Sequence, residues 1–349
     1  MAINWGVIGA GGIAQRRTIP EGILAAECAK LVAVQDAAYD RAQAVGAKFG
    51  VSAVYASEYD LLADENVQAV YIATPTHLHA DQVIVAAEAG KHVLCEKPLG
   101  LTLQECETMI EACDEANVKL GVNFMMRFHA CHTKLKAMIE AGELGRLVMG
   151  RAELTCWYPP IPGAFRQDPE LGGGGALIDM GNHCIDLLEM LFGRTVEVSC
   201  FTGNLVQAYA SEDTAVATLR FESGAIGVVD NMFNVPDAAA RNALEVYGSK
   251  GSVWAWGTIG QDSAGKLHAT LERGDKAYDA AQVREGQGGE ATLEPGVVNM
   301  YQAHIEAFCA AIESDAEPPI SGEDGLWSHK VIEACYESAR TGRNVSVAG

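Results

Sequence analysis

The fold is decided by the stretch Ile3-Asn4-Trp5-Gly6-Val7-Ile8-Gly9-Ala10-Gly11-Gly12-Ile13-Ala14. An apolar run typical of a buried strand leads here through a glycine-rich turn into the start of a helix. Gly9 allows the tight turn, Gly11 lacks the Cβ that would block a pyrophosphate, and Ala14 lets helix and strand pack closely. The N–H groups of Gly12 and Ile13 then face phosphate groups at the positive end of the helix dipole. The stretch therefore predicts a dinucleotide-binding turn.

Asp36 follows the second predicted strand, about 20 residues beyond the glycine turn. A carboxylate at this place accepts a hydrogen bond from the ribose 2′-hydroxyl of NAD and repels the 2′-phosphate of NADP. Ala37 and Ala38 supply no cation for that phosphate, although Arg41 lies nearby in the sequence. We therefore expect NAD as the cofactor, with NADP less favoured. The alternative, an aspartate that only caps the next helix, fits Asp40 better.

The rest of the first third alternates between strand-like and helix-like segments. Strands that are buried on both faces and joined by helices form a parallel, doubly wound α/β sheet. We therefore predict a Rossmann domain over residues 1–125. Its predicted strands lie at 3–8, 31–35, 69–73, 92–95 and 119–123, and its predicted helices at 40–49, 78–89 and 103–117.

Residues 126–349 are predicted to form a second, α+β domain for substrate binding and oligomer contacts. Long strands at 146–158 and 195–275, several of them alternating, predict a large, mostly antiparallel, open-faced sheet. Residues 276–296, rich in Gly, Glu and Gln, are predicted as a loop without a chemical signal. The predicted helices lie at 129–141, 176–191, 299–313 and 325–340, and the last is expected to pack back on the Rossmann domain.

Composition and charge argue against several classes of protein. Twenty-five basic against 46 acidic residues give a net charge of -21, so nucleic acid and anionic membrane surfaces are not expected as partners. No apolar run approaches the roughly 20 residues of a membrane helix, and no secretory leader is recognised. The ten cysteines show no C-x-x-C spacing, and most fall inside apolar runs. We expect reduced thiols and a cytoplasmic location.

Glu96 and Lys97 stand in the run Cys95-Glu96-Lys97-Pro98-Leu99, directly after a buried predicted strand. A lone lysine is usually a solvated surface group. Charged residues at the carboxyl end of a parallel strand, however, fall in the crevice where such sheets bind ligands. This position makes the pair a candidate functional site.

Asp179 and His183 form a second candidate, after the glycine run at 172–175. The helical spacing of the apolar residues places the two side chains four apart on one face. A carboxylate one turn away can fix the tautomer of an imidazole, as a general base requires. From the spacing alone, a pair kept for structure is the simpler interpretation.

Two runs of the sequence closely resemble the Gfo/Idh/MocA oxidoreductases, which are named for glucose–fructose oxidoreductase and inositol dehydrogenase. They are Ala73-Thr74-Pro75-Thr76-His77 and Gly90-Lys91-His92-Val93-Leu94-Cys95-Glu96-Lys97-Pro98. The glycine run followed by Asp179-x-Gly-x-His183-x-x-Asp is similar to the other signature of that family. With the nucleotide turn, these motifs span residues 5–188, and beyond them the resemblance is one of architecture.

The resemblance implies hydride transfer between a nicotinamide cofactor and a secondary hydroxyl of a sugar, cyclitol or glycoside. It implies that Lys97 positions the reacting hydroxyl, that His183 takes its proton, and that Asp179 shapes the substrate site. Such chemistry needs a base, a cation and a closely held acceptor. The residues implied at the nicotinamide half of the cofactor are Thr74, Pro75, His77, Glu96 and Lys97.

Three further residues are weaker candidates for substrate contacts. Arg127, after the last strand of the Rossmann domain, is expected to touch substrate or cofactor, or else to form an interdomain ion pair. Trp157 and Arg166 are expected to line the substrate site, with strand-end packing as the alternative for this segment. No compact set of three or four Cys, His or carboxylate ligands is recognised, so no metal is expected.

Two other functions stay open on the same scaffold. One is an NADPH-dependent reductase of a keto-sugar, which Asp36 disfavours. The other is a non-catalytic nucleotide-binding regulator, which the presence of both Lys97 and His183 disfavours. A homodimer or homotetramer is expected, because the uncovered face of a large sheet must be solvated or paired.

Overall fold

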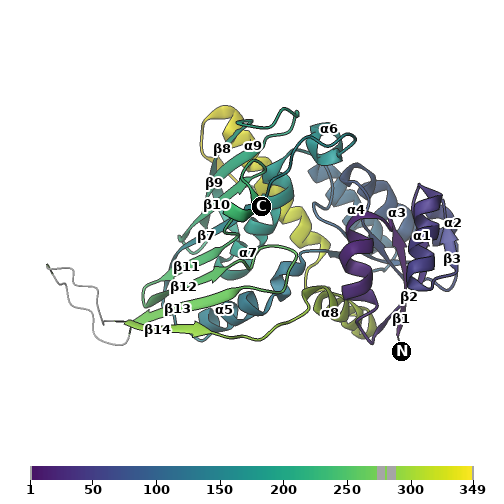
Figure 1. Cartoon of the computed structure of the whole chain (residues 1–349), viewed down its shortest axis with the longest axis horizontal. Coiled ribbons are helices and arrows are strands. Elements are labelled where there is room, and N and C mark those ends of the chain that lie inside the picture. Colours follow the sequence, from purple (N-terminus) through teal and green to yellow (C-terminus); the bar gives the residue numbers. More distant parts are fainter. Residues whose placement is uncertain (1, 273–279, 281–287, 348–349) are drawn as a thin grey trace.

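The computed structural model describes residues 2–272, 280 and 288–347, which build two sheets with helices around them (Figure 1). The first is a 6-stranded sheet in the order β3-β2-β1-β4-β5-β6, and its described pairs are parallel. This confirms the predicted doubly wound α/β fold. The strands are β1 (Ile3–Ile8), β2 (Ala29–Gln35), β3 (Ala53–Tyr55), β4 (Ala69–Ile72), β5 (His92–Cys95) and β6 (Leu120–Val122).

Helices connect these strands on both faces of the sheet. The short strand β3 and the helix after it were not expected from the sequence, because three half-buried residues give no clear apolar period. The connecting helices are η1 (Ala14–Ile23), α1 (Tyr39–Phe49), α2 (Glu58–Leu62), η2 (Thr76–Leu78), α3 (His79–Glu88) and α4 (Leu103–Glu115).

The strand order places the ligand-binding edge. The chain runs from β1 to β2 and β3 on one side, and then returns to build β4, β5 and β6 on the other. In such a sheet the ligand crevice opens at the carboxyl ends of the strands, where the order reverses. The reversal lies between β1 and β4, so residues that follow β1, β2, β4 and β5 share this edge.

The second sheet has nine strands in the order β14-β13-β12-β11-β7-β10-β9-β8-β15. Only β7 and β10 pair in parallel among its described pairs, which confirms the mostly antiparallel sheet. The strands are β7 (Leu147–Thr155), β8 (Thr195–Gly203), β9 (Thr214–Phe221), β10 (Ile226–Met232), β11 (Leu244–Gly248), β12 (Gly251–Trp256), β13 (Lys266–Glu272), β14 (Gly288–Leu293) and β15 (Val345–Ser346).

The prediction of a loop over residues 276–296 was wrong in part. Residues 288–293 form β14, which pairs antiparallel with β13 at the edge of the sheet. The run Gly-Gly-Glu-Ala-Thr-Leu has few β-branched residues, so its strand depends on the neighbouring β13 rather than on local preference. Residues 276–279 and 281–287 of this prediction lie outside the described part of the chain.

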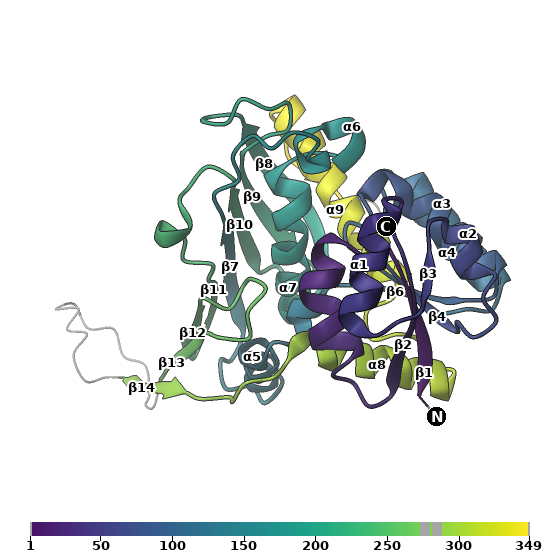
Figure 2. The same ribbon diagram turned by 45° about the vertical axis from the view of Figure 1, so that its right-hand side comes forward.

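Helices cover one face of the second sheet. Figure 2 shows α5 (Ala130–Glu140) and α7 (Asn182–Phe192) on the side of the sheet that faces the Rossmann domain. In β9, buried residues alternate with exposed or half-buried ones along the strand, as expected when only one face is packed. The core of this domain therefore lies between the sheet and these helices.

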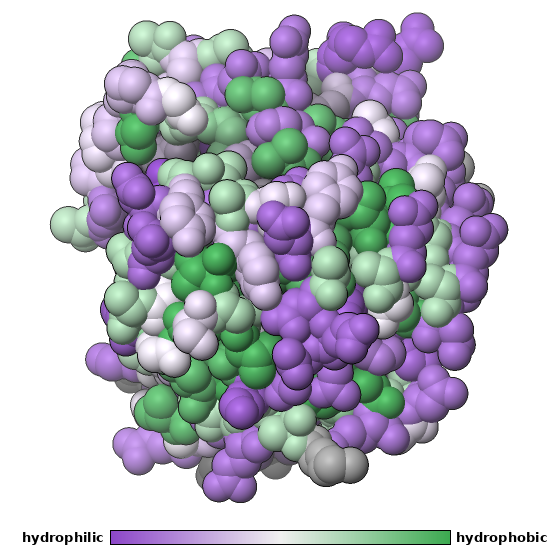
Figure 3. Space-filling model, turned by 90° about the vertical axis from the view of Figure 1, so that its right-hand side faces the viewer, coloured by the Kyte–Doolittle hydropathy of each residue, from purple (hydrophilic) through white to green (hydrophobic). Residues whose placement is uncertain are grey.

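The last two helices, α8 (Met300–Ser314) and α9 (Gly322–Thr341), pack against the Rossmann domain. Phe308 of α8 lies against Trp5, with ring centroids 5.7 Å apart. A Cβ on Gly325 of α9 would lie 2.7 Å from the side chain of Val122 in β6. The outer side of the Rossmann domain mixes hydrophilic and hydrophobic residues, as solvated surfaces do (Figure 3).

Candidate active site

The glycine turn has the backbone that the sequence predicts. Gly9 has a φ of +76°, and a Cβ there would lie 2.9 Å from the backbone nitrogen of Thr74. Gly11 packs closely against Asp36, because a Cβ on Gly11 would lie 3.2 Å from Oδ2 of that residue. Ala14 is fully buried at the start of η1. Gly12 has a φ of +57° and open space beside its Cα, just before the N-terminus of η1. These features fit a pyrophosphate cradle.

Asp36 is buried directly after β2, and its carboxylate belongs to the same turn. It accepts hydrogen bonds from the backbone N–H of Gly11 at 3.1 Å and of Ala38 at 3.0 Å. Nη1 of Arg41 lies 3.5 Å from Oδ1 of Asp36, on a side chain that is 59% exposed. The carboxylate is thus fixed beside the turn, and the exposed guanidinium of Arg41 lies next to it.

The residues predicted for the nicotinamide half follow β4 and β5. Thr74 donates a hydrogen bond from Oγ1 to Gln82 at 2.6 Å, and Pro75 leads into η2. His77 lies in η2, and its Nδ1 is buried without a partner among the described residues. Glu96 follows β5, so these residues stand on the same edge of the sheet as the glycine turn.

Lys97 and Asp179 join the two domains. Nζ of Lys97 donates to Oδ1 of Asp179 at 2.8 Å and to its backbone oxygen at 2.7 Å. The lysine side chain is 9% exposed and the aspartate 19%. Arg166 donates from Nε to the same Oδ1 at 2.8 Å. Two cations therefore share one carboxylate at the carboxyl end of β5.

These charges decide the protonation of the site. Burial opposes the ionisation of Asp179, but Arg166 and Lys97 outweigh it and hold the pKa of this carboxyl well below its ordinary value. Burial and the nearby Lys97 hold the pKa of His183 well below its ordinary value. At neutral pH, Asp179 is thus a carboxylate and His183 a neutral imidazole, which is the form that accepts a proton.

The helix around these two residues differs from the prediction of one helix over 176–191. It is split into a wide π-helical turn, η5 (Leu177–Gly181), followed by α7. Asp179 lies in η5 and turns to Lys97 and Arg166, while Nδ1 of His183 is buried without a partner among the described residues. Spacing of four residues therefore does not pair the carboxylate with the imidazole here. Such π-helical turns are frequent at functional sites.

Glu212 anchors the glycine run, and sequence reasoning missed it. Its carboxylate accepts hydrogen bonds from the N–H groups of Gly175 and Leu177, both at 2.9 Å, and from the hydroxyl of Tyr336 at 2.9 Å. A Cβ on Gly174 would collide with that hydroxyl, and one on Gly175 with the backbone of Glu212. The glycines are thus needed for close packing beneath Asp179. Because Glu212 lies more than thirty residues away in the chain, no local pattern identifies it.

The structure places the weaker candidates differently from one another. Arg127, just after the end of β6, forms an ion pair with Asp186 at 2.6 Å and lies 3.4 Å from Asp324, so its described charge partners all belong to residues 126–349. Trp157 is 44% exposed beyond the end of β7. Arg166 lies in the charged cluster with Asp179. Among the three, Arg166 is the one that touches a predicted catalytic residue.

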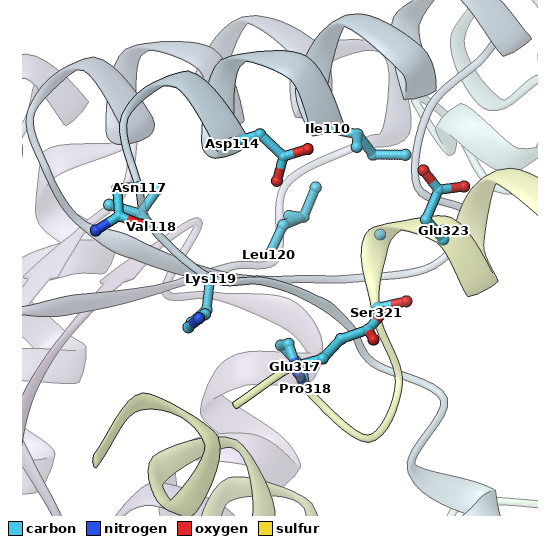
Figure 4. A pocket seen from close by; sticks show the side chains of 11 residues that line it. Ile110, Asp114, Asn117, Val118, Lys119, Leu120, Glu317, Pro318, Ser321 and Glu323 are labelled. Atoms are coloured by element: carbon cyan, nitrogen blue, oxygen red, sulfur yellow. The ribbon is translucent and has the colours of Figure 1, made fainter. Parts of the chain in front are cut away.

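A pocket of about 300 Å³ lies elsewhere on the Rossmann domain (Figure 4). It is lined in part by Leu120, the first residue of β6, and by Asp114 and Glu323. It therefore opens at the amino edge of the parallel sheet, opposite the edge that carries Lys97. None of the predicted site residues lines it.

No three His, Cys, Asp or Glu side chains in the described part of the chain are grouped so as to hold a metal ion. None of its helices is both long and apolar enough to span a membrane.

Comparison with known proteins covers most of the chain. A family model described as "Oxidoreductase family, NAD-binding Rossmann fold" matches residues 3–124. A second, described as "GFO/IDH/MocA C-terminal domain", matches residues 132–254. The two models meet close to the place where the first sheet ends.

Similar proteins extend over nearly the full length. The chain is 31% identical to the 1,5-anhydro-D-fructose reductase of Ensifer adhaerens, over 99% of this chain and 98% of that one. It is 31% identical to the myo-inositol 2-dehydrogenase of Thermotoga maritima, over 98% of both chains. The crystal structure of aldose-aldose oxidoreductase from Caulobacter crescentus, complexed with glycerol, matches with a TM-score of 0.87 and 27% identity, covering 99% of this chain and 100% of that one.

Proposed function

The chain belongs to the Gfo/Idh/MocA family of oxidoreductases, and on that premise we propose that it oxidises a secondary hydroxyl of a sugar, cyclitol or glycoside with NAD. The observation that carries the proposal is the contact of Lys97 with Asp179 at 2.8 Å. It brings a cation from the nucleotide-binding edge against a carboxylate one helical turn from a neutral imidazole, His183.

The proposed reaction assigns one task to each side chain. Lys97 holds the hydroxyl oxygen of the substrate and stabilises the negative charge that develops there. The hydroxyl proton moves to the imidazole of His183. The C–H bond breaks with its electron pair, which leaves as hydride, so the carbon is oxidised to a carbonyl. Bound NAD supplies the acceptor for that hydride. Asp179 keeps Lys97 and Arg166 in place as their shared counter-ion.

The cradle of Gly9, Gly11 and Asp36 supports NAD as the cofactor. The carboxyl group of Asp36 is held by two backbone N–H groups, so it is placed to accept the ribose hydroxyl and to exclude a 2′-phosphate. We assign the adenosine half to the end of β2 and the nicotinamide half to the ends of β4 and β5.

Arg41 favours a second candidate function, the NADPH-dependent reduction of a keto-sugar. Its guanidinium lies 3.5 Å from Asp36 and is mostly exposed, so it is free to turn toward a 2′-phosphate. The buried carboxylate of Asp36 opposes that use, and we therefore keep NAD-dependent oxidation as the main proposal.

We also propose that the chain forms a homodimer or homotetramer through the open face of the second sheet. Cross-strand pairing places Phe201 beside Val216 on this face, and both are exposed. Trp254 of β12 and Ile226 of β10 are exposed on the same face, with β11 and β7 between their strands. Between them Arg151 bonds to Asp230 at 3.0 Å. Apolar groups around a central ion pair are suited to a self-complementary interface.

A screen of hydroxyl compounds tests the proposed function. The wild-type protein is incubated with NAD and a panel of aldoses, inositols and glycosides while the absorbance of NADH is followed. NADH formation with one class supports the proposal and identifies the substrate. The reverse screen uses keto-sugars with NADPH. Silence in both directions, with cofactor binding intact, favours a non-catalytic regulator.

A further inference from the structure

Glu96 is the end of a buried chain of hydrogen bonds. Its Oε1 accepts from the hydroxyl of Tyr71 and, at 2.7 Å, from Nδ2 of Asn123. Oδ1 of Asn123 lies 2.9 Å from Nδ1 of His304. Tyr71, Asn123 and His304 are at most 3% exposed. The chain thus links the end of β5 with α8, more than two hundred residues further along the sequence.

The direction of each hydrogen bond in this chain is determined. Burial, followed by the charge of Glu96, raises the pKa of Tyr71 well above its ordinary value, so its hydroxyl keeps a proton to donate. Burial lowers the pKa of His304 to about 3, so its ring is neutral and carries one N–H. An amide oxygen only accepts hydrogen bonds, so that N–H is at Nδ1 and points to Asn123. The orientation of the amide follows from Glu96, because a carboxylate only accepts hydrogen bonds and the N–H of Asn123 must therefore point to it, which leaves the amide oxygen facing His304.

Two donors on one oxygen hold Glu96 as an acceptor with a fixed position. The ring of Phe128 stacks on His304 with centroids 5.1 Å apart and keeps the imidazole in place. Lys97, the neighbouring cation, is occupied by Asp179. Glu96 therefore receives its described hydrogen bonds from Tyr71 and Asn123 and not from the lysine next to it in the chain, and its charge is one of those that raise the pKa of the nearby Arg166.

The topology decides which part of a dinucleotide this charge faces. Asp36 marks the adenosine end after β2, and Gly9 and Gly11 mark the pyrophosphate after β1. In the order β3-β2-β1-β4-β5-β6, the other half must lie over β4 and β5, where Glu96 stands. The oxidised nicotinamide ring carries a positive charge and the reduced ring carries none.

We propose that Glu96 makes this protein bind NAD⁺ preferentially over NADH, and that His304, acting through Asn123, is the positioning residue that holds the carboxylate for this task. The inference rests on the proposed function, since it requires a nicotinamide cofactor. A fixed carboxylate attracts the cationic ring and not the neutral one. The preference opposes product inhibition, because the reduced cofactor is released more readily than the oxidised one is.

The test compares dissociation constants and needs no turnover. NADH binding is measured by fluorescence titration, and NAD⁺ binding by competition against NADH. Glu96→Gln keeps the shape and the accepting oxygen but removes the charge. We expect the ratio of Kd for NADH to Kd for NAD⁺ to fall about fivefold, mainly through weaker NAD⁺ binding. The matched control is Glu111→Gln, an exposed glutamate of α4, which should leave the ratio unchanged.

Two variants of His304 test the positioning. His304→Phe keeps the stacking on Phe128 but removes the Nδ1 donor, and we expect the ratio to fall about twofold to threefold. His304→Asn offers an amide N–H at the same place and should restore the wild-type ratio. Thermal unfolding of each variant identifies a loss of structure. Such a loss would weaken the binding of both cofactors alike and leave the ratio of their dissociation constants unchanged.

The outcomes separate this inference from the proposed function. If the wild-type protein binds neither NAD⁺ nor NADH, the proposed function fails and the inference fails with it. If both bind and Glu96→Gln leaves their ratio unchanged, the inference is overturned while the proposed function stands. If Glu96→Gln shifts the ratio and His304→Phe does not, the role of His304 is overturned.

Discussion

Lys97, which follows β5, donates two hydrogen bonds to Asp179 in the π-helical turn. Its ammonium group contacts both a side-chain oxygen and the backbone oxygen of that aspartate. The contact joins the nucleotide-binding edge to the second domain. It also places the lysine where it can act on a substrate held between the two.

Replacing Lys97 with Ala should reduce kcat about 100- to 1,000-fold, because the developing alkoxide loses its charged partner. NADH binding should change less than twofold, since the glycine turn and Asp36 are untouched. Steady-state kinetics and fluorescence titration measure the two effects. Lys119→Ala, which removes an ion pair with Asp315 far from the site, serves as the control. Near-normal turnover in Lys97→Ala would refute the assigned role.

The pH profile of kcat/KM should report His183. Because its pKa in the folded protein is lowered, the imidazole stays unprotonated as pH falls through its ordinary range near 6.5. We therefore expect kcat/KM for alcohol oxidation to remain flat from pH 7 to about pH 6 and to decline only further into the acid range. A decline centred at or above pH 6.5 would contradict this environment. His183→Ala should remove the acid limb together with about 100-fold or more of the activity.

Asp36 should control the choice between the two cofactors. Asp36→Ala removes the carboxylate that repels a 2′-phosphate and frees Arg41 to bind it. We expect the ratio of kcat/KM with NADP to kcat/KM with NAD to rise at least about tenfold. Adding Arg41→Ala to this variant should cancel the gain. An unchanged ratio in Asp36→Ala would show that another group selects the cofactor.

Glu212 should be a stability determinant as well as a support for the site. Glu212→Ala leaves the N–H groups of Gly175 and Leu177 and the hydroxyl of Tyr336 without their acceptor. We expect the free energy of unfolding to fall by about 2–4 kcal/mol, measured by urea denaturation. Glu222→Ala, at an exposed turn, is the control and should change it by less than about 0.5 kcal/mol. If Glu212→Ala and Glu222→Ala had the same free energy of unfolding, the proposed role of Glu212 in stabilising the glycine run would be contradicted.

The open face of the second sheet should hold the oligomer together. Sedimentation of the wild-type protein should give a multiple of the 37.0 kDa chain mass. Phe201→Arg places a charge in the apolar part of this face and should shift the mass toward that of a single chain. Val297→Arg, at an 81% exposed position outside the strands, should leave the mass unchanged. A wild-type protein that sediments as a single chain would disprove the proposal.

Much of the fold could be predicted because its signals are local. The turn at Gly9 and Gly11 needs particular backbone angles and close approaches, and only a few residue types permit them. Parallel strands that are buried on both faces appear as continuous apolar runs. Strand β14 has no such signal, since its pairing with β13 is set by the neighbour rather than by its own residues.

The candidate site could be predicted only as far as its motifs extend. Lys97 and His183 stand in recognisable runs, but their partners come from distant parts of the chain. His304 reaches the site from α8 and Glu212 from the segment before β9, and no spacing connects either residue with the motifs. The helical period also predicted that Asp179 would face His183, whereas the π-helical turn directs it to Lys97. Tertiary contacts decide these details.

The two hydrogen bonds from Lys97 to Asp179 also bear on the stereochemistry of the reaction. An ammonium group has three hydrogens, and here two of them are committed to the backbone and side-chain oxygens of one residue. A single N–H direction is left for a substrate. The ammonium group, which would otherwise rotate freely, thus offers the substrate one N–H in a fixed direction. A substrate hydroxyl of one configuration can accept this hydrogen bond, whereas the hydroxyl of the epimer points away from it. In addition to the shape of the pocket, Lys97 therefore selects the configuration of the reacting carbon.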